Sequence, residues 1–302
     1  MKTNNQPCNF FLMTENSFHP TYLVSQWYTK FQGNPFFRGI LIRDDKNDAS
    51  HQSKERFHQL HQKEKLLTSD SLQEIQTLYG GLSKTEEAMI RLFGIPALAQ
   101  NSFQKSIFLG KTINSEKVKE WLQIECKNEG KICMFVFLDK ILSPWWIELT
   151  EGNIINAHSA VLPYARGMFA VENMASRGDI EEFKRVAGAS VHYVDEGVDT
   201  GPIIRAVRIQ NPFEFQSLSE VKAYSYKLAF DLLIQQASEM IENPQIQSVG
   251  IKAYPTLISP VFSRKDYTPQ VEELAEKRFI EMKQDSVNAI KTKTTYKKIP
   301  TG

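Results

Sequence analysis

The chain has few cysteines and no long apolar run, and these absences exclude several classes of protein. Three cysteines, Cys8, Cys126 and Cys133, occur among 302 residues. We expect reduced thiols, because an odd, scattered set builds neither a disulfide framework nor a zinc knuckle. No stretch approaches the roughly 20 apolar residues of a membrane-spanning helix, and the first residues lack a cleavage pattern of a secretory signal. We therefore expect a soluble, cytoplasmic protein.

An excess of charge of one sign is also missing. Lysine and arginine number 36 against 35 aspartates and glutamates, with both signs interspersed, so neither a basic stripe for nucleic acid nor an acidic tail is present. Walker, HExxH and GxSxG motifs are absent. His51, His58 and His61 lie on a polar helical stretch, where we expect solvated side chains and no metal site. The expected partners are small molecules, without nucleic acid or membrane, and no pattern indicates an oligomeric state.

What the sequence does contain is an alternation of strand and helix patterns. Hydrophobic residues make up 41% of the chain, which is ample for a core. Helices are predicted at 53–67, 115–126 and 217–241, the last with Ser217 and Glu220 as a capping box. This alternation favours the α/β class, a Rossmann-like, mostly parallel sheet covered by helices. Strands are predicted at 9–15, 37–43, 106–110, 132–138, 153–158, 189–194 and 202–209.

The domain organisation follows from the same pattern. Residues 1–210 are predicted to form the Rossmann-like domain. Residues 211–302 are predicted to be a helical or extended C-terminal segment, whose charged, Lys-rich end reads as an amphipathic helix with a frayed terminus.

Polar residues follow predicted strands at the places where a parallel sheet binds ligands, outside the carboxyl ends of its strands. Asn156 and His158 lie two positions apart, so their side chains face the same side of a strand. An amide and an imidazole placed together can donate hydrogen bonds to one oxygen, as an oxyanion site requires. Taken alone, the pair is better explained as an asparagine that forms a turn at the end of a strand and a histidine buried in the core.

A second set of residues lies around Asp199. Gly197 and Gly201 flank it and let the backbone approach a ligand closely. Asp199 can pair with His158 and accept a proton from an attacking nitrogen. Its alternative is the aspartate of a simple Asx-turn. His192, inside a predicted strand, is either a neighbour of the site or a plain core histidine.

Three ordered blocks of the chain together resemble the formyltetrahydrofolate-dependent formyltransferase family. They are Ile141–Pro144 (ILSP), Asn156–Gly167 (NAHSAVLPYARG) and His192–Ile204 (HYVDEGVDTGPII). The resemblance is strong over about residues 131–209 and covers the first 130 residues only in outline. It implies the formyltransferase fold, with residues 1–210 as the catalytic domain and a helical C-terminal extension.

The resemblance also implies roles for individual residues. Asn156 and His158 would hold the formyl oxygen as it becomes an oxyanion, and Asp199 would orient His158 and take the proton of the nucleophile. The co-substrate would be 10-formyltetrahydrofolate. Its pterin would lie between two loops that bind chiefly through backbone groups, formed by Leu138, Lys140, Ile141, Leu142, Asp195, Glu196 and Val198.

Departures from the family pattern bear on the acceptor. The stretch Thr14–Pro20 lacks the glycine-rich phosphate loop of ribonucleotide-using members and carries Glu15, which would repel a phosphate. The run Asn156–Gly167, followed by Glu172 and Asn173, most resembles the siderophore hydroxyornithine formyltransferases. The favoured acceptor is the side-chain hydroxylamine of hydroxyornithine, with Glu15, Arg166 or Glu172 as possible contacts. The alternatives are a nucleotide-sugar amine formyltransferase, a formyltetrahydrofolate hydrolase, and a non-catalytic folate-binding protein.

Overall fold

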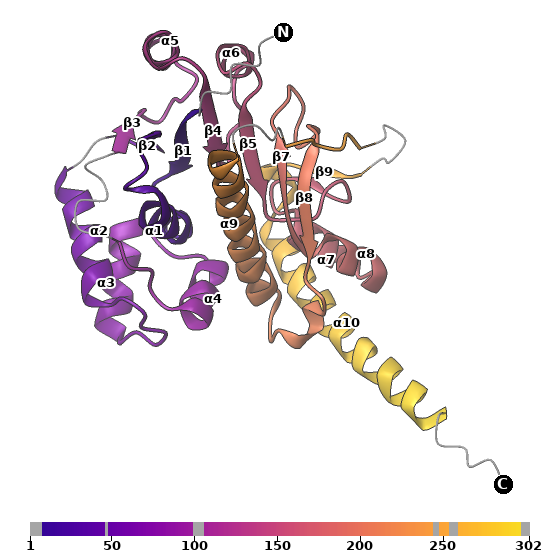
Figure 1. The fold of residues 1–302 in the computed structure, drawn as a ribbon. Coiled ribbons are helices and arrows are strands. Elements are labelled where there is room, and N and C mark those ends of the chain that lie inside the picture. The colour runs from indigo at the N-terminus through magenta and orange to yellow at the C-terminus, as the bar shows by residue number, and fades with distance from the viewer. Residues whose placement is uncertain (1–7, 46–47, 99–105, 244–247, 254–258, 297–302) are drawn as a thin grey trace.

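A computed structural model describes residues 8–45, 48–98, 106–243, 248–253 and 259–296 of the chain. Within this part, seven strands form one sheet in the order β3-β2-β1-β4-β5-β7-β8 (Figure 1). The pairs from β3 to β5 are parallel, whereas β7 is antiparallel to both β5 and β8. The predicted mostly parallel α/β sheet is confirmed. Its strands are β1 (Asn9–Glu15), β2 (Phe37–Arg43), β3 (Ser106–Phe108), β4 (Ile132–Val136), β5 (Ile154–His158), β7 (Gly188–Tyr193) and β8 (Ile203–Arg208).

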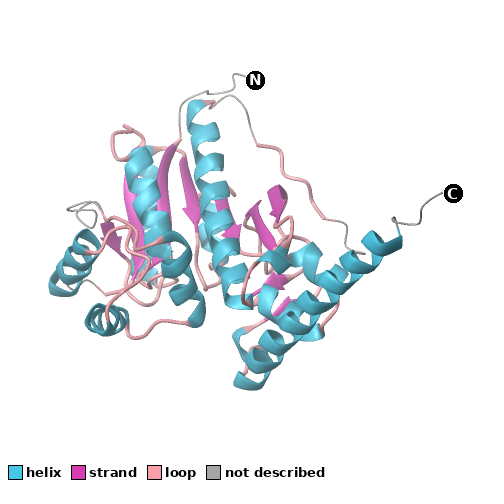
Figure 2. Cartoon of the chain, turned by 90° about the horizontal axis from the view of Figure 1, so that it is seen from below, coloured by secondary structure: helices cyan, strands magenta, loops and turns pink. Residues whose placement is uncertain are grey.

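The helices lie over both faces of this sheet and at its ends, and a small second sheet pairs β6 (Arg166–Gly167) with β9 (Val261–Phe262). The predicted C-terminal helices are present as α9 and α10. Both views place α10 toward the β8 end of the sheet, whereas α2 and α3 lie toward its β3 end (Figures 1 and 2). The helices are α1 (Pro20–Phe31), α2 (Asp48–Leu60), α3 (Ser69–Tyr79), α4 (Lys84–Phe93), α5 (Glu116–Glu129), α6 (Pro144–Leu149), α7 (Ala170–Arg177), α8 (Ile180–Val186), α9 (Leu218–Glu242) and α10 (Pro269–Tyr296), with short 3-10 turns at Pro212–Glu214 and Arg264–Asp266.

The period-two alternation of the strands divides the core between two faces of the sheet. In β1, Phe10 and Leu12 face α1 and α9, while Phe11 and Met13 join a cluster with α5 and α6. The central strand β4 is buried along its whole length, as its uninterrupted apolar sequence predicts. The sheet therefore has a filled layer on each side, and polar side chains are left to the ends of the strands.

The C-terminal helices pack in two different places. Helix α9 shares the main core with α1 and with strands β5 and β7. Helix α10 packs mainly against α7, with Ala275, Phe279 and Met282 buried in a third cluster. Its second half extends away from the rest of the molecule (Figure 1). None of the helices in the described residues is long and apolar enough to cross a membrane.

Two expectations about the first hundred residues are wrong. The helix predicted at 53–67 instead spans Asp48–Leu60, and a second helix, α3, begins at Ser69 after its N-cap Thr68. His51 and His58 are buried rather than solvated, with 4% and 0% of their surface exposed. His58 sits between the carbonyl oxygen of Pro96 and the hydroxyl of Tyr79, 2.8 and 2.7 Å away. The polar sequence pattern misled because both imidazoles face inward. Buried polar side chains of this kind form hydrogen bonds with protein groups instead of water.

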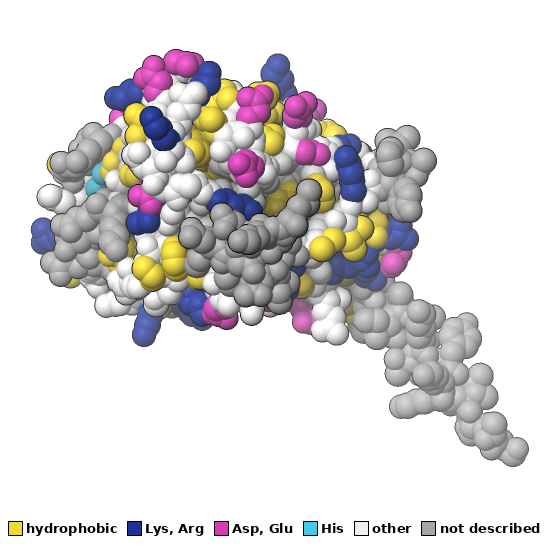
Figure 3. All heavy atoms as spheres, turned by 45° about the horizontal axis from the view of Figure 1, so that its top comes forward, with side chains coloured by type: hydrophobic (Ala, Val, Ile, Leu, Met, Phe, Trp, Pro, Cys, Tyr) yellow, Lys and Arg dark blue, Asp and Glu magenta, His cyan; other side chains and the backbone are white. Residues whose placement is uncertain are grey.

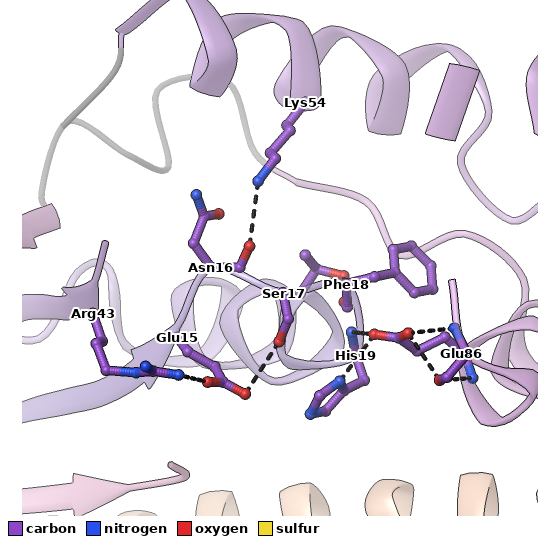
Figure 4. A network of polar contacts seen from close by, with 10 residues as sticks. Glu15, Asn16, Ser17, Phe18, His19, Arg43, Lys54 and Glu86 are labelled. Carbon is purple, nitrogen blue, oxygen red and sulfur yellow. Dashed lines mark hydrogen bonds and ion pairs between the residues drawn. The ribbon is translucent and has the colours of Figure 1, made fainter. Parts of the chain in front are cut away.

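The segment that leaves β1 is held from both sides (Figure 4). On one side, the carbonyl oxygen of Asn16 accepts a hydrogen bond from Lys54 of α2 at 3.3 Å. On the other side, Glu86 of α4 receives hydrogen bonds from the backbone and ring of His19, at 3.2 and 3.0 Å. The second carboxylate oxygen of Glu86 closes a capping box with Ser83. One buried carboxylate thus joins the start of α4 to the start of α1.

Glu86 should therefore make the stability of the fold depend on pH. Burial raises its pKa, but hydrogen bonds and charge from His19, with donors from Ser83, outweigh burial and hold the pKa at about 2. A depressed folded-state pKa stabilises the fold above the ordinary value of 4.5, and this contribution is lost as the pH falls toward 2. The shift corresponds to about 3 kcal/mol. Urea unfolding between pH 5.5 and pH 3 should show a smaller loss of stability in Glu86→Gln than in the wild type.

The matched control is Glu87→Gln, the neighbouring position on the same helix turn, which should keep the wild-type pH dependence. If Glu86→Gln and the wild type lose stability in parallel as the pH falls, the tie between α1 and α4 does not depend on the ionised carboxylate.

Candidate active site

The antiparallel pairing of β5 with β7 brings the first site residues together. Asn156 lies directly opposite His192, and His158 lies opposite Ser190, in register. Directly opposed residues point to the same face of a sheet. The Nδ2 of Asn156 lies 3.1 Å from Nε2 of His192. His192, for which the sequence left two readings, is therefore a neighbour of Asn156.

Asp199 reaches this pair from the loop between β7 and β8. We expected all three site segments at the carboxyl ends of parallel strands. That is wrong for Asp199: β7 is antiparallel, so its carboxyl end lies beside the amino end of β5, where Val194 bonds Ile154. The loop then folds back along the sheet. Within this loop, Asp199 has a left-handed backbone conformation (φ 50°), which is uncommon for a residue other than glycine.

The predicted contact between Asp199 and His158 is present. The Oδ2 of Asp199 lies 3.5 Å from Nδ1 of His158, and its Oδ1 lies 3.3 Å from Nε2 of His192. The backbone N–H of Gly167 donates to Oδ2 at 2.7 Å. An amide, two imidazoles and a carboxylate from three segments thus form one cluster, in which the carboxylate is only 14% exposed.

The other ring nitrogens assign the protons of this cluster. The Nε2–H of His158 donates to the carbonyl oxygen of Ala165 at 3.2 Å, and the Nδ1–H of His192 donates to that of Tyr193 at 2.7 Å. In neutral rings, the nitrogens that face Asp199 therefore carry lone pairs. A proton added to either ring would lie on the side of the carboxylate and would be shared with it.

Burial controls the charge of these groups. Burial lowers the pKa of His158, and the effect outweighs the opposing effect of Asp199. Burial raises the pKa of Asp199, but the charge of His158 when protonated, the hydrogen bond and charge of protonated His192, and the N–H of Gly167 together hold this pKa well below its usual range. At neutral pH the cluster thus pairs a carboxylate anion with an uncharged His158.

The loops predicted to hold the pterin come to the same face of the sheet. Leu142 is buried in the cluster of β4, α5 and α6, and Leu138 packs against that cluster together with Val194, the residue before Asp195. Asn114 fixes the first loop by bonding the backbone of Ile141 and Ser143, each at 2.9 Å. Lys140, Ile141 and Glu196 are exposed, while Asp195 and Val198 are half-buried.

Asp195 shapes the second loop rather than pointing to solvent. Its Oδ1 accepts hydrogen bonds from the hydroxyl of Thr200 at 2.5 Å and from the backbone of Gly197 at 3.1 Å. The side chain therefore serves the turn, and the backbone of residues 195–198 is the part left for a ligand.

Charged residues alternate at the carboxyl ends of β1, β2 and β4. Glu15 pairs with Arg43, as Figure 4 shows. The Nη2 of Arg43 also lies 2.8 Å from Asp139, whose second oxygen is 2.7 Å from Arg264. The Nε of Arg43 is buried without a hydrogen-bond partner. Two acids and two arginines thus form one row of alternating charge. Figure 3 shows another part of the surface, seen from the end of the sheet where α5 and α6 lie, and side chains of both signs occur there as well.

The two remaining acceptor candidates are engaged inside the protein. Arg166 donates to the hydroxyl and the carbonyl oxygen of Ser259, at 2.8 and 3.1 Å. Glu172 is buried beside Lys222 of α9, at 3.4 Å. Sequence reasoning missed Lys222, although a signal existed: it occupies the same helix face as Leu218 and the half-buried Tyr226, where an apolar residue is expected.

Comparisons with known proteins agree with this arrangement. Residues 92–219 match the family model described as "Formyl transferase". The phosphoribosylglycinamide formyltransferase of Bacillus subtilis is 31% identical over 138 residues, 45% of this chain and 64% of that protein. The methionyl-tRNA formyltransferase of Microcystis aeruginosa is 27% identical over 129 residues, 42% of this chain and 37% of that protein. The chain spans less than two thirds of the length of these relatives.

Solved structures extend the likeness of the fold beyond that region. A sugar N-formyltransferase from Shewanella sp. superposes with a TM-score of 0.51 and 14% identity, covering 89% of this chain and 87% of that one. The formyltransferase fold predicted from the sequence is confirmed by this likeness.

Gly167, whose N–H donates to Asp199, should be hard to replace because its backbone conformation and its contact with β9 leave no room for a side chain. Its φ is 81°, and a Cβ at this position would overlap the carbonyl oxygen of Phe262 in β9. Gly152→Ala is the matched control, since Gly152 has a similar φ of 74° but open space around it. Gly152→Ala should cost about 1–2 kcal/mol in urea unfolding. Gly167→Ala should cost clearly more; equal costs would show that β6 and β9 adjust freely.

Proposed function

We propose that this chain transfers the formyl group of 10-formyltetrahydrofolate to the side-chain hydroxylamine of hydroxyornithine or a similar small amine, as in hydroxamate siderophore synthesis. The observation that carries the transfer chemistry is the cluster of Asn156, His158, His192 and Asp199. It offers two hydrogen-bond donors to the formyl oxygen, and one carboxylate to the proton of the attacking nitrogen.

Asn156 and His158 would stabilise the oxyanion. When the acceptor nitrogen attacks the formyl carbon, the carbonyl oxygen gains negative charge. Asn156 has a second amide N–H besides the one directed at His192. The Nε2–H of His158 would turn from the carbonyl oxygen of Ala165 to the formyl oxygen, because an anion accepts more strongly than a neutral carbonyl.

Asp199 would take the proton. A hydroxylamine nitrogen is uncharged at neutral pH and attacks with its lone pair, so a proton must leave only as the tetrahedral intermediate forms and collapses. The nitrogens of His158 and His192 that face Asp199 lie 3.5 and 3.3 Å from it, so the three groups can share that proton. The proton then passes to the tetrahydrofolate nitrogen that leaves.

The pterin would bind between residues 138–142 and 195–198. Ile141 is 67% exposed although it is apolar, so it offers a surface to a flat ring. Leu138, Leu142 and Val198 would line the slot, and backbone groups of Lys140, Asp195 and Glu196 would contact the edge of the ring. Asn114 holds the first loop in place without a ligand.

The row of Glu15, Arg43, Asp139 and Arg264 supports an amino acid as the acceptor. It presents anions and cations alternately, which suits the ammonium and carboxylate of a zwitterion. A phosphate would meet Glu15 where phosphate-binding loops place backbone N–H groups. This charge pattern is the reason for preferring hydroxyornithine to a ribonucleotide or a nucleotide-linked amino sugar.

Acceptor competition tests the proposal. With 10-formyltetrahydrofolate, hydroxyornithine should be formylated faster than its analogue without the α-carboxylate, and much faster than glycinamide ribonucleotide. Preferred turnover of a nucleotide-linked amino sugar would replace the proposed acceptor with the second candidate. Formate release without any acceptor would identify a hydrolase, and the absence of every reaction with folate bound would leave a binding protein.

Substitutions in the cluster should separate chemistry from folding. Asn156→Ala should lower kcat by roughly 10²–10³, the usual cost of one oxyanion donor. Asp199→Asn keeps the shape of the side chain but removes the anion, and should lower kcat by at least about 10². Steady-state kinetics measure both, with circular dichroism to show that each variant is folded. Loss of less than tenfold in either variant would assign that residue to packing.

A further inference from the structure

Lys222 is a lysine in the interior of the protein. Only 3% of its surface is exposed, and it lies on α9 between the buried residues Val221 and Ala223. A lysine in such a place must find partners, because an isolated buried ammonium loses its hydration without compensation. Its partners therefore indicate what the charge does in the fold.

Three groups surround the ammonium of Lys222. It donates to the hydroxyl of Ser159 at 3.0 Å and lies 3.4 Å from Oε2 of Glu172 in α7. It also lies 4.9 Å from the ring centre of Tyr226, one turn further along α9. Ser159 directly follows His158 and is 8% exposed, so the ammonium is attached to the residue next to the imidazole.

We propose that Lys222 is a positioning residue of the active site, whose ammonium anchors the turn after His158 and places a fixed positive charge behind the imidazole. The anchoring follows from the hydrogen bond to Ser159, and the charge is fixed because Glu172 and Tyr226 hold it from the other sides. The inference deepens the proposed formyl transfer and rests on it for its kinetic readout alone.

The charges around His158 explain why a fixed cation matters. Asp199 faces the ring from the β7–β8 loop and favours an imidazolium, whereas burial, His192 on β7 and Lys222 on α9 oppose it. Glu172 lies 3.4 Å from the ammonium of Lys222 and balances its charge. An uncharged His158 keeps its Nε2–H for the formyl oxygen and leaves its other nitrogen free to share the proton released to Asp199. Lys222 therefore helps to keep the ring in the state that the reaction uses.

The main experiment removes the charge and keeps the length of the side chain. Lys222→Met should shift the titration of His158 to higher pH. NMR of the imidazole measures this titration, and the signal that is missing in His158→Asn identifies the ring. The acid limb of kcat/KM should move in the same direction. Lys227→Met is the matched control: this lysine lies on the same helix but pairs with the half-exposed Asp231, so neither readout should change.

Two further variants separate the anchor from the charge. Ser159→Ala removes the hydrogen bond but keeps the ammonium, so it should lower kcat without moving the titration of His158. Lys222→Arg keeps the charge and should restore the titration even where the larger head disturbs packing. If Lys222→Met is unfolded, the comparison of Lys222→Arg with Ser159→Ala still decides, since a shift of the His158 titration in Ser159→Ala would contradict a role for the charge.

The two proposals can fail separately. If the titration of His158 moves in Lys222→Met while no acceptor is formylated, the electrostatic role of Lys222 stands and the proposed reaction does not. If formylation proceeds and the titration in Lys222→Met matches that in Lys227→Met, Lys222 is an internal ion pair of the fold only, and this inference is overturned.

Discussion

The site depends on one buried carboxylate that must remain an anion. Asp199 gives up most of its contact with water, and its charge is supported by the N–H of Gly167 and, when they are protonated, by two imidazoles within 3.5 Å. Each supporting group constrains another part of the chain: Gly167 must follow β9 closely, His192 must lie opposite Asn156, and the loop must accept a left-handed residue. Desolvation of a single group thus dictates the course of three separate segments.

The fold supplies these constraints by combining two kinds of strand pairing. The parallel strands β1, β2 and β4 end together and place Glu15, Arg43 and Asp139 in one row, which Arg264 joins from the 3-10 turn Arg264–Asp266. The antiparallel strand β7 instead places His192 beside Asn156 and returns the chain over the sheet as far as Asp199. One edge of the sheet therefore contributes alternating charges, and the adjoining face contributes the cluster of amide, imidazole and carboxylate.

Local pattern was enough to predict the strands of the main sheet, whereas the pairing of His158 with Asp199 was favoured only by the resemblance of the three sequence blocks to a known family. The bounds of β1 and β2 agree with the prediction because each contains a mainly apolar run bounded by polar residues. The direction of β7 and the inward orientation of His51 and His58 were not predictable, since both depend on contacts between segments distant in sequence. The position of Lys222 on the inner face of its helix could be read from the sequence, but its partners Ser159 and Glu172 could not, because they lie on other elements.

The register of β5 against β7 has a consequence for how this chain can change in length. Side chains alternate between the two faces with a period of two, so adding or deleting a single residue within either strand would turn Asn156 or His192 to the opposite layer. The edge strand β8, half of whose residues are exposed, carries no such restriction on its outer end. Insertions and deletions that evolution accepts should therefore be found at the rim of the sheet and not within strands β5 and β7.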